Sequence, residues 1–236
     1  MTTPVDEDAE LAELVEQNPA RARIFEDYNL DFCCGGDQSL REACDESGLS
    51  IDEIREALEL VDARSETDGP EQLDSAADLV DFIVDHHHEF LREELAPLGE
   101  LVEKVERVHG DGHPELHEVA EAFEELAREI PKHLSEEEQI VFPAVRRLEA
   151  GDASEAQLQT AREVLSRLEE DHDDTADLLE QIREATDEFE VPDDACPSYE
   201  NMLERLERLE EDLHLHVHRE NNVLFEMVRE RAEPAC

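Results

Sequence analysis

The sequence carries one short pattern of metal-binding residue types twice. His133 is followed four positions later by Glu137, and His216 is followed four positions later by Glu220. Residues four apart lie on the same face of a helix, so each pair presents an imidazole and a carboxylate side by side. Imidazole and carboxylate ligands without a thiolate suit iron or manganese. The repeated pattern therefore predicts metal binding from two helix faces.

The repeat extends toward the N-terminus. His88 lies 45 residues before His133, and His172 lies 44 residues before His216. Single histidines on helices usually have an ordinary role at the surface or in the core, but two copies with matching spacing are harder to obtain by chance. The run "DHHH" leaves a choice, in which the spacing favours His88 and His87 is the alternative.

Two such helix hairpins, packed around a pseudo-two-fold axis, would bring four histidines and two glutamates to one point in a bundle core. This predicts a two-metal site with two histidines on each metal and two bridging carboxylates, because bundle interiors are where such sites are built. His109 is excluded from this site, since it lies 21 residues beyond His88. That spacing corresponds to about 31 Å along a helix.

The elements that must position these residues are four long helical patterns, and strand signals are absent. The patterns cover residues 75–108, 115–149, 154–190 and 198–231, with a kink expected at Pro131. Short polar segments join them, which predicts an all-α, up-down-up-down four-helix bundle.

A smaller unit precedes the bundle. Residues 1–63 read as short helices with the loop "DFCCGG" at 31–36, residues 64–74 as a linker, and residues 75–236 as the bundle. The loop contains the adjacent Cys33 and Cys34, and its glycines permit positive φ. The cysteines at 44, 196 and 236 are expected to be incidental.

Charge excludes one class of partner. The chain has 68 Asp and Glu against 20 Lys and Arg, a formal net charge of −48. Such a field repels the phosphates of nucleic acids. Because the acids are interleaved with apolar residues at helical spacing, we expect a folded, halophilic-type protein. The absence of a membrane-length apolar run or a signal-peptide pattern, and five irregularly spaced cysteines, indicate no membrane association and a reducing, cytoplasmic location.

Several motifs together resemble one known family. The segments "NLDFCCGG", "HHEFLREEL", "KVERVHG", "HPEL", "EEEQIVFP", "EDHDDTADLL" and "HRENNVLF" are similar to those of the RIC family, di-iron proteins that repair iron–sulfur centres. The resemblance spans nearly the whole chain and implies a hemerythrin-like bundle with an oxo- and carboxylate-bridged di-iron site. It implies the ligands His88, His133, Glu137, His172, His216 and Glu220, and selects His88 as the second His of an "HH-x-aromatic" motif.

The resemblance also implies a function in stress response. Family members protect or restore iron–sulfur clusters damaged by nitric oxide or peroxide, through iron donation or reduction of NO to N2O, which would be a di-iron nitric oxide reductase activity. The expected partners are damaged iron–sulfur proteins and the small molecules NO or O2. The alternative is a hemerythrin-like O2- or NO-binding or iron-sensing protein without catalysis. An oxygen carrier would place a further His four residues after His172, where this chain has Ala176.

Four residues outside the ligand set are expected to assist. Glu129 and Asp171 are candidates to orient ligand imidazoles or relay protons. Cys33 and Cys34 are expected to act as redox or transfer thiols, or to form an intermolecular disulfide in a homodimer.

Overall fold

The computed structural model describes residues 5–65, 75–226 and 229. Regular structure within these residues is helical, apart from one isolated bridge between Glu10 and Ser39. The chain divides into two compact units, one made of Met1–Asp74 with Leu215–Glu226 and the other of Ser75–His214 with Met227–Cys236. Of the expected linker 64–74, the first two residues belong to a helix and the others lie outside the described residues.

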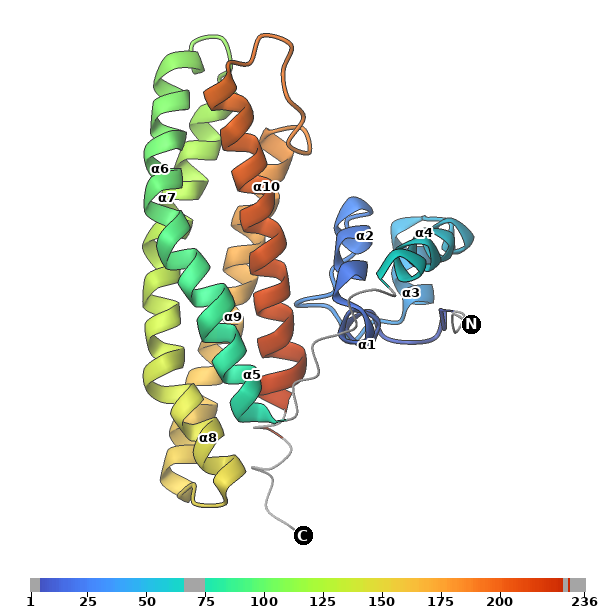
Figure 1. The fold of residues 1–236 in the computed structure, drawn as a ribbon, viewed down its shortest axis with the longest axis vertical. Coiled ribbons are helices and arrows are strands. Elements are labelled where there is room, and N and C mark those ends of the chain that lie inside the picture. The colour runs from blue at the N-terminus through green and yellow to red at the C-terminus, as the bar shows by residue number, and fades with distance from the viewer. Residues whose placement is uncertain (1–4, 66–74, 227–228, 230–236) are drawn as a thin grey trace. The chain divides into compact units, whose positions relative to one another are not determined.

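The larger unit is an all-α bundle, as the helical patterns predicted (Figure 1). Its helical segments are α5 (Ala76–Phe82), a π-helical turn (Ile83–His88), α6 (Glu89–His109), α7 (Glu115–Glu136), a π-helical turn (Glu137–Val141), α8 (Phe142–Ala150), α9 (Glu155–Ala185) and most of α10 (Pro197–His218). The end of α10 from Leu215, and the π-helical turn that continues it (Arg219–Phe225), belong to the smaller unit. Among the described residues, no helix combines the length and the apolarity needed to cross a bilayer.

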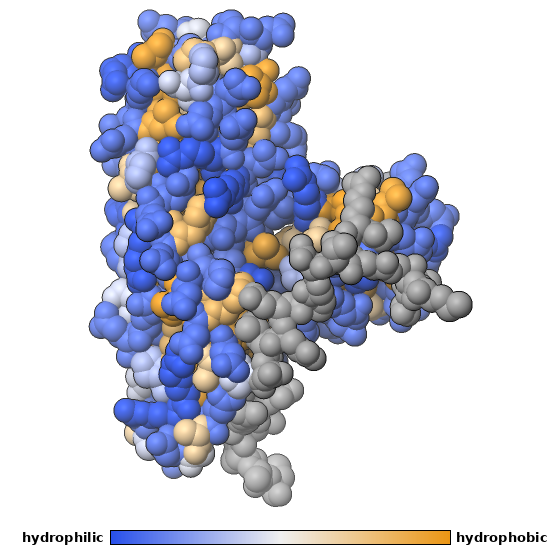
Figure 2. Space-filling model, in the orientation of Figure 1, coloured by the Kyte–Doolittle hydropathy of each residue, from blue (hydrophilic) through white to orange (hydrophobic). Residues whose placement is uncertain are grey.

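Apolar side chains at helical spacing hold the bundle together. On α6 the buried positions follow each other at intervals of four and three residues, at Leu91, Leu95, Leu98, Val102 and Val105. This spacing forms a single apolar stripe along one face. Stripes on α7, α9 and α10 meet it in one core cluster. The outer surface is largely hydrophilic in the view of Figure 2, as expected for a strongly acidic chain.

The bundle helices contain two features that the sequence did not predict. Helix α7 includes Pro131, where a kink is expected, and the backbone changes to a π-helical turn six residues later, at Glu137. Helix α9 ends at Ala185 rather than near Glu190, because residues 187–189 have positive φ. Phe189 of this left-handed turn is buried and lies under the guanidinium of Arg183.

The smaller unit contains four short helices before residue 66. They are α1 (Leu11–Gln17), α2 (Ala22–Asp27), α3 (Leu40–Ser47) and α4 (Ile51–Ser65), with a 3-10 turn (Pro19–Arg21) ahead of α2. Helix α3 begins with a capping box between Ser39 and Glu42 and ends at Gly48, whose φ of 69° favours glycine. Phe25 and Phe32 lie in a shared apolar core.

Two valines on α6 test the contribution of the apolar stripe to stability. Val102 is 2% exposed and Val108 is 63% exposed. We expect Val102→Ala to lower the free energy of unfolding by about 2 kcal/mol, because it removes buried methyl groups and leaves a cavity. Val108→Ala is the matched control and should change it by less than about 0.5 kcal/mol. Chemical denaturation followed by helical circular dichroism measures both, and equal effects would contradict this description of the core.

Candidate metal centre

Three π-helical turns carry predicted ligands. His88 ends the turn Ile83–His88, Glu137 begins the turn Glu137–Val141, and Glu220 lies in the turn Arg219–Phe225. In the second turn the backbone N–H of Phe142 donates to the carbonyl of Glu137, five residues earlier. Such turns are rare and occur mostly as bulges at functional sites. The two sequence repeats therefore share a backbone irregularity beside the same glutamate position.

Glu137 is a fully buried carboxylate. It is 0% exposed, and neither of its oxygens accepts a hydrogen bond from any residue that the structure describes. Instead, His133 Nε2 lies 2.8 Å from Oε1, and His88 Nε2 lies 3.4 Å from Oε2. A buried carboxylate without hydrogen-bond donors is costly unless a cation compensates its charge. The surroundings of Glu137 therefore fit a bound cation on each side of the carboxylate.

Two imidazoles converge beside Glu137 Oε1. The Nε2 atoms of His133 and His172 lie 2.9 Å apart, and His172 Nε2 lies 3.9 Å from Glu137 Oε1. Both ring nitrogens point into one buried space, since His172 is 2% exposed. This arrangement suits two nitrogen ligands that share one metal ion.

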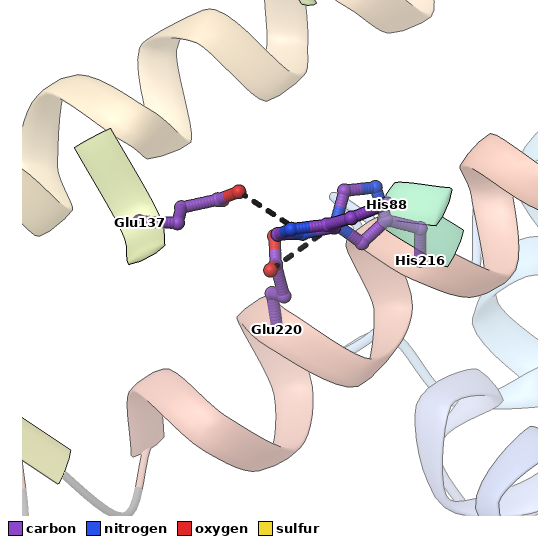
Figure 3. A group of neighbouring side chains, drawn as sticks. All are labelled: His88, Glu137, His216 and Glu220. Carbon is purple, nitrogen blue, oxygen red and sulfur yellow. Dashed lines mark ion pairs between the residues drawn. The ribbon is translucent and has the colours of Figure 1, made fainter. Parts of the chain in front are cut away.

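The last helical segment supplies the second copy of the repeat. His216 Nε2 lies 3.1 Å from Glu220 Oε1, and the two residues are 2% and 0% exposed. Figure 3 shows these side chains with His88 and Glu137. The ligand atoms form two groups, each within 4.8 Å: His88, Glu137, His216 and Glu220, and His133, Glu137, His172 and Glu220. Both carboxylates belong to both groups.

Acidic side chains contact the outer nitrogens of two histidines. His88 Nδ1 lies 2.7 Å from Glu138 Oε1, which also accepts a hydrogen bond from Arg92. Partial burial raises the pKa of Glu138, but the hydrogen bonds from His88 and Arg92 lower it by more than burial raises it. The pKa of Glu138 therefore lies below its usual value. A carboxylate at Nδ1 holds the proton there and leaves the Nε2 lone pair free for a metal.

Asp171 has the corresponding place beside His133. Its Oδ2 lies 3.5 Å from His133 Nδ1, and the interaction with this imidazole lowers the pKa of Asp171. Glu129, the other candidate, forms ion pairs with Lys132 and Arg128 at the surface. Sequence reasoning missed Glu138, because the spacing from His133 selects Glu137 in the run "EEE" and the partner of Glu138, His88, lies 50 residues away.

The neighbouring histidines have other partners. His87, the alternative to His88, bonds through Nδ1 to Asp212 Oδ1 at 2.9 Å and belongs to neither ligand group. His218 lies two residues after His216. It is 3% exposed, and its ring contacts Phe32 edge-on at 5.8 Å. His218 is therefore a core residue of the smaller unit.

Asp31 organises the loop with the adjacent cysteines. Its Oδ1 accepts hydrogen bonds from the backbone N–H groups of Cys33 and Cys34, and its Oδ2 accepts one from Gly35. At Gly36 a Cβ atom would lie 2.4 Å from the carbonyl oxygen of Phe32, so only glycine fits. The two Sγ atoms are 3.9 Å apart and form no disulfide.

The two thiols of this loop differ in environment. Cys33 is buried, whereas Cys34 is partly exposed. The hydrogen bond with Cys34, followed by burial, raises the pKa of Cys33 well above its usual value. The loop backbone bonds to the segment that follows α10, because Asn222 Nδ2 donates to the carbonyl of Cys33 at 3.0 Å. Asp31, Cys33 and Cys34 form a third group of potential ligand atoms.

Comparisons with known proteins agree with this architecture. A family model described as the hemerythrin HHE cation binding domain matches residues 79–228, and the ScdA_N model, described as a domain of unknown function, matches residues 7–62. The iron–sulfur cluster repair protein ScdA of Staphylococcus haemolyticus is 35% identical, over 91% of this chain and 95% of the relative. The iron–sulfur cluster repair protein YtfE of Pectobacterium carotovorum is 33% identical, over 92% and 95% of the two chains. The chain therefore belongs to the hemerythrin HHE family and to the family of iron–sulfur cluster repair proteins.

Proposed function

We propose that the bundle core binds two iron ions through four histidines and two glutamates. His88 and His216 would hold one ion, and His133 and His172 the other. The observation that carries this proposal is that Glu137 and Glu220 each belong to both groups of converging ligand atoms. A carboxylate shared in this way can contact two metals at once, one through each oxygen.

The donor set supports iron as the metal. Both groups contain imidazole and carboxylate and no thiolate, and this combination is typical of iron or manganese rather than of soft metals. The relatives are named for repair of iron–sulfur clusters, which favours iron between the two. Two buried carboxylates also need cationic charge nearby, which two divalent ions supply.

Bound iron would supply redox chemistry and open positions for a small diatomic molecule. The chain's own residues would fix the geometry and exclude water, since His88, Glu137 and Glu220 are all 0% exposed. Glu138 would keep the proton of His88 at Nδ1. Asp171 is 44% exposed and could exchange a proton between His133 Nδ1 and solvent.

The function that this site supports best is protection or repair of iron–sulfur clusters damaged by nitrosative or oxidative stress. Two routes use the same centre. The chain could donate iron to a damaged cluster, or it could reduce NO to N2O and so act as a nitric oxide reductase. The expected partners are damaged iron–sulfur proteins, as the names of the relatives indicate, and NO or O2.

The adjacent cysteines would take part as transfer or redox thiols, and the structure favours Cys34 as the first to react. Cys34 is partly exposed, whereas Cys33 is buried and its raised pKa keeps its thiol protonated. The thiolate is the metal ligand and the nucleophile in such chemistry.

Metal content tests the two-iron proposal. We expect the chain purified without oxygen and reconstituted with ferrous iron to hold two iron ions, and Mössbauer spectroscopy should show a coupled pair after oxidation. His133→Ala should hold at most one, because it removes a nitrogen from one ion. His86→Ala is the matched control, since this exposed His bonds to the carbonyl of Phe82 within its own helix, and it should keep both ions. A single ion in the native chain, or a zinc preference, would contradict the proposal.

Iron retention and gas release separate the two routes of repair. The iron-loaded chain is incubated with an NO-damaged iron–sulfur protein under argon, and iron per chain, cluster recovery and N2O are followed. Donation predicts loss of iron from the chain in proportion to cluster recovery, whereas NO reduction predicts N2O with two irons retained. Neither recovery nor N2O would mean that the chain only binds or senses a diatomic molecule, and both routes would fail.

Glu138 tests the contribution of the outer carboxylates. We expect Glu138→Gln to lower iron affinity about 10- to 100-fold, because the amide no longer holds the proton of His88 at Nδ1. Competition with a chelator measures the affinity. Glu136→Gln is the matched control, since Glu136 pairs with Arg167 at the surface and touches no predicted ligand. Equal affinities of the two variants would show that Glu138 contributes charge alone.

A further inference from the structure

A second cluster of reactive side chains lies at the other end of α10. Cys196 stands immediately before this helix, and its Sγ lies 3.3 Å from Nε2 of His109, the last residue of α6. Twenty residues of helix, or about 30 Å, separate Cys196 from His216. The Cys196–His109 pair is therefore independent of the metal centre.

Three groups stabilise negative charge on Cys196. The backbone N–H groups of Tyr199 and Ser198, in the first turn of α10, favour the thiolate electrostatically. The N–H of Tyr199 donates its hydrogen bond to the carbonyl of Cys196 at 2.8 Å, and His109 Nε2 contacts Sγ at 3.3 Å. A helix N-terminus favours an anion, and a neighbouring imidazole does the same. The backbone N–H of Tyr199, followed by the contact with His109, lowers the pKa of Cys196 to about 7.

The surrounding charged groups have partners of their own. His113 lies between two carboxylates, with Nδ1 at 2.9 Å from Glu115 and Nε2 at 3.2 Å from Asp194. Lys104 Nζ donates to the hydroxyl of Ser198 at 3.0 Å. Burial, with these two carboxylates, raises the pKa of Tyr199 to about 12, so its phenol is neutral at physiological pH. The titratable side chain that contacts the Cys196 sulfur is therefore His109, and not one of these neighbours.

We propose that Cys196 and His109 form a thiolate–imidazole pair that exchanges with low-molecular-weight disulfides, which makes Cys196 a modification site separate from the metal centre. In this reaction the Cys196 thiolate attacks one sulfur of the disulfide. The original S–S bond breaks, a mixed disulfide forms on Cys196, and the other half leaves as a thiolate. Cys196 is oxidised and the leaving half is reduced, so no further reactant is needed.

Cys33 and Cys44, the two buried cysteines of the smaller unit, do not share this environment. Burial raises the pKa of Cys44, and Cys33 is also held protonated. At pH 7 a thiol with a pKa of about 7 is half ionised, against about 1% for one with a pKa of 9. The lower basicity reduces the reactivity of each thiolate by about eightfold, which leaves a net advantage of about sixfold. The position of the pH profile is therefore a sharper readout than the rate alone.

The test uses the full iron-loaded chain and cystamine as the disulfide. Samples are quenched in acid after timed exposure between pH 5.5 and 9.5, and peptide-resolved mass spectrometry measures the mixed disulfide at Cys196. We expect a midpoint near pH 7, with Cys44 unmodified in the folded chain. Iron content should stay constant throughout, because the pair is remote from the metal centre.

Two substitutions isolate the role of the imidazole. His109→Gln should move the midpoint upward by about one pH unit and slow exchange at pH 7 severalfold. His113→Gln, a neighbouring and chemically identical change that does not touch Sγ, should leave the midpoint in place. A midpoint near pH 9 in the native chain would overturn the proposal without any variant. An unchanged midpoint in a folded His109→Gln chain would overturn the pairing.

Discussion

The burial of two carboxylates in an apolar helix bundle constrains the rest of the structure. Glu137 and Glu220 are both 0% exposed, and the bundle around them is packed with leucine, valine and phenylalanine. Neither carboxylate could remain charged there without compensation. Four histidines on four helical segments converge on these oxygens, so the helices must hold their mutual positions for the site to exist. The apolar stripes hold the helices in place, and the histidines and glutamates on them form the two groups of potential metal ligands.

The sequence predicted the histidine and glutamate positions because the pattern occurs twice at matching spacing. A lone His-x-x-x-Glu would have carried little information in a chain this rich in glutamate. The matching intervals from His88 to His133 and from His172 to His216 instead indicate two similar helix hairpins. The all-α architecture followed from apolar periodicity for the same reason. The ligand spacing and the apolar periodicity both recur along the chain, and a recurring pattern can be recognised in a single sequence.

Features that depend on contacts between distant segments could not be predicted in this way. The contact of Glu138 with His88 joins positions 50 residues apart, and that of Cys196 with His109 joins positions 87 residues apart. Cys196 therefore looked incidental from its neighbours in sequence. Helix α9 ends early because of a left-handed turn at 187–189. This turn contains no glycine, so its residue types did not predict positive φ. The π-helical turn at Glu137 has no compositional signal, so the sequence did not predict it.

The π-helical turns also change the phase of the helices that contain them. Each residue advances an α-helix by about 100°, so a wider turn rotates the side chains that follow relative to those before it. In the segment from α7 to α8, the buried face before the turn includes Ile130 and Leu134, and after it Phe142 and Val145. Between them the turn carries Glu137 on the inward side without ending the apolar face on either side. The turn thus accommodates one extra residue, so that the buried face continues from Leu134 through Glu137 to Phe142 and Val145.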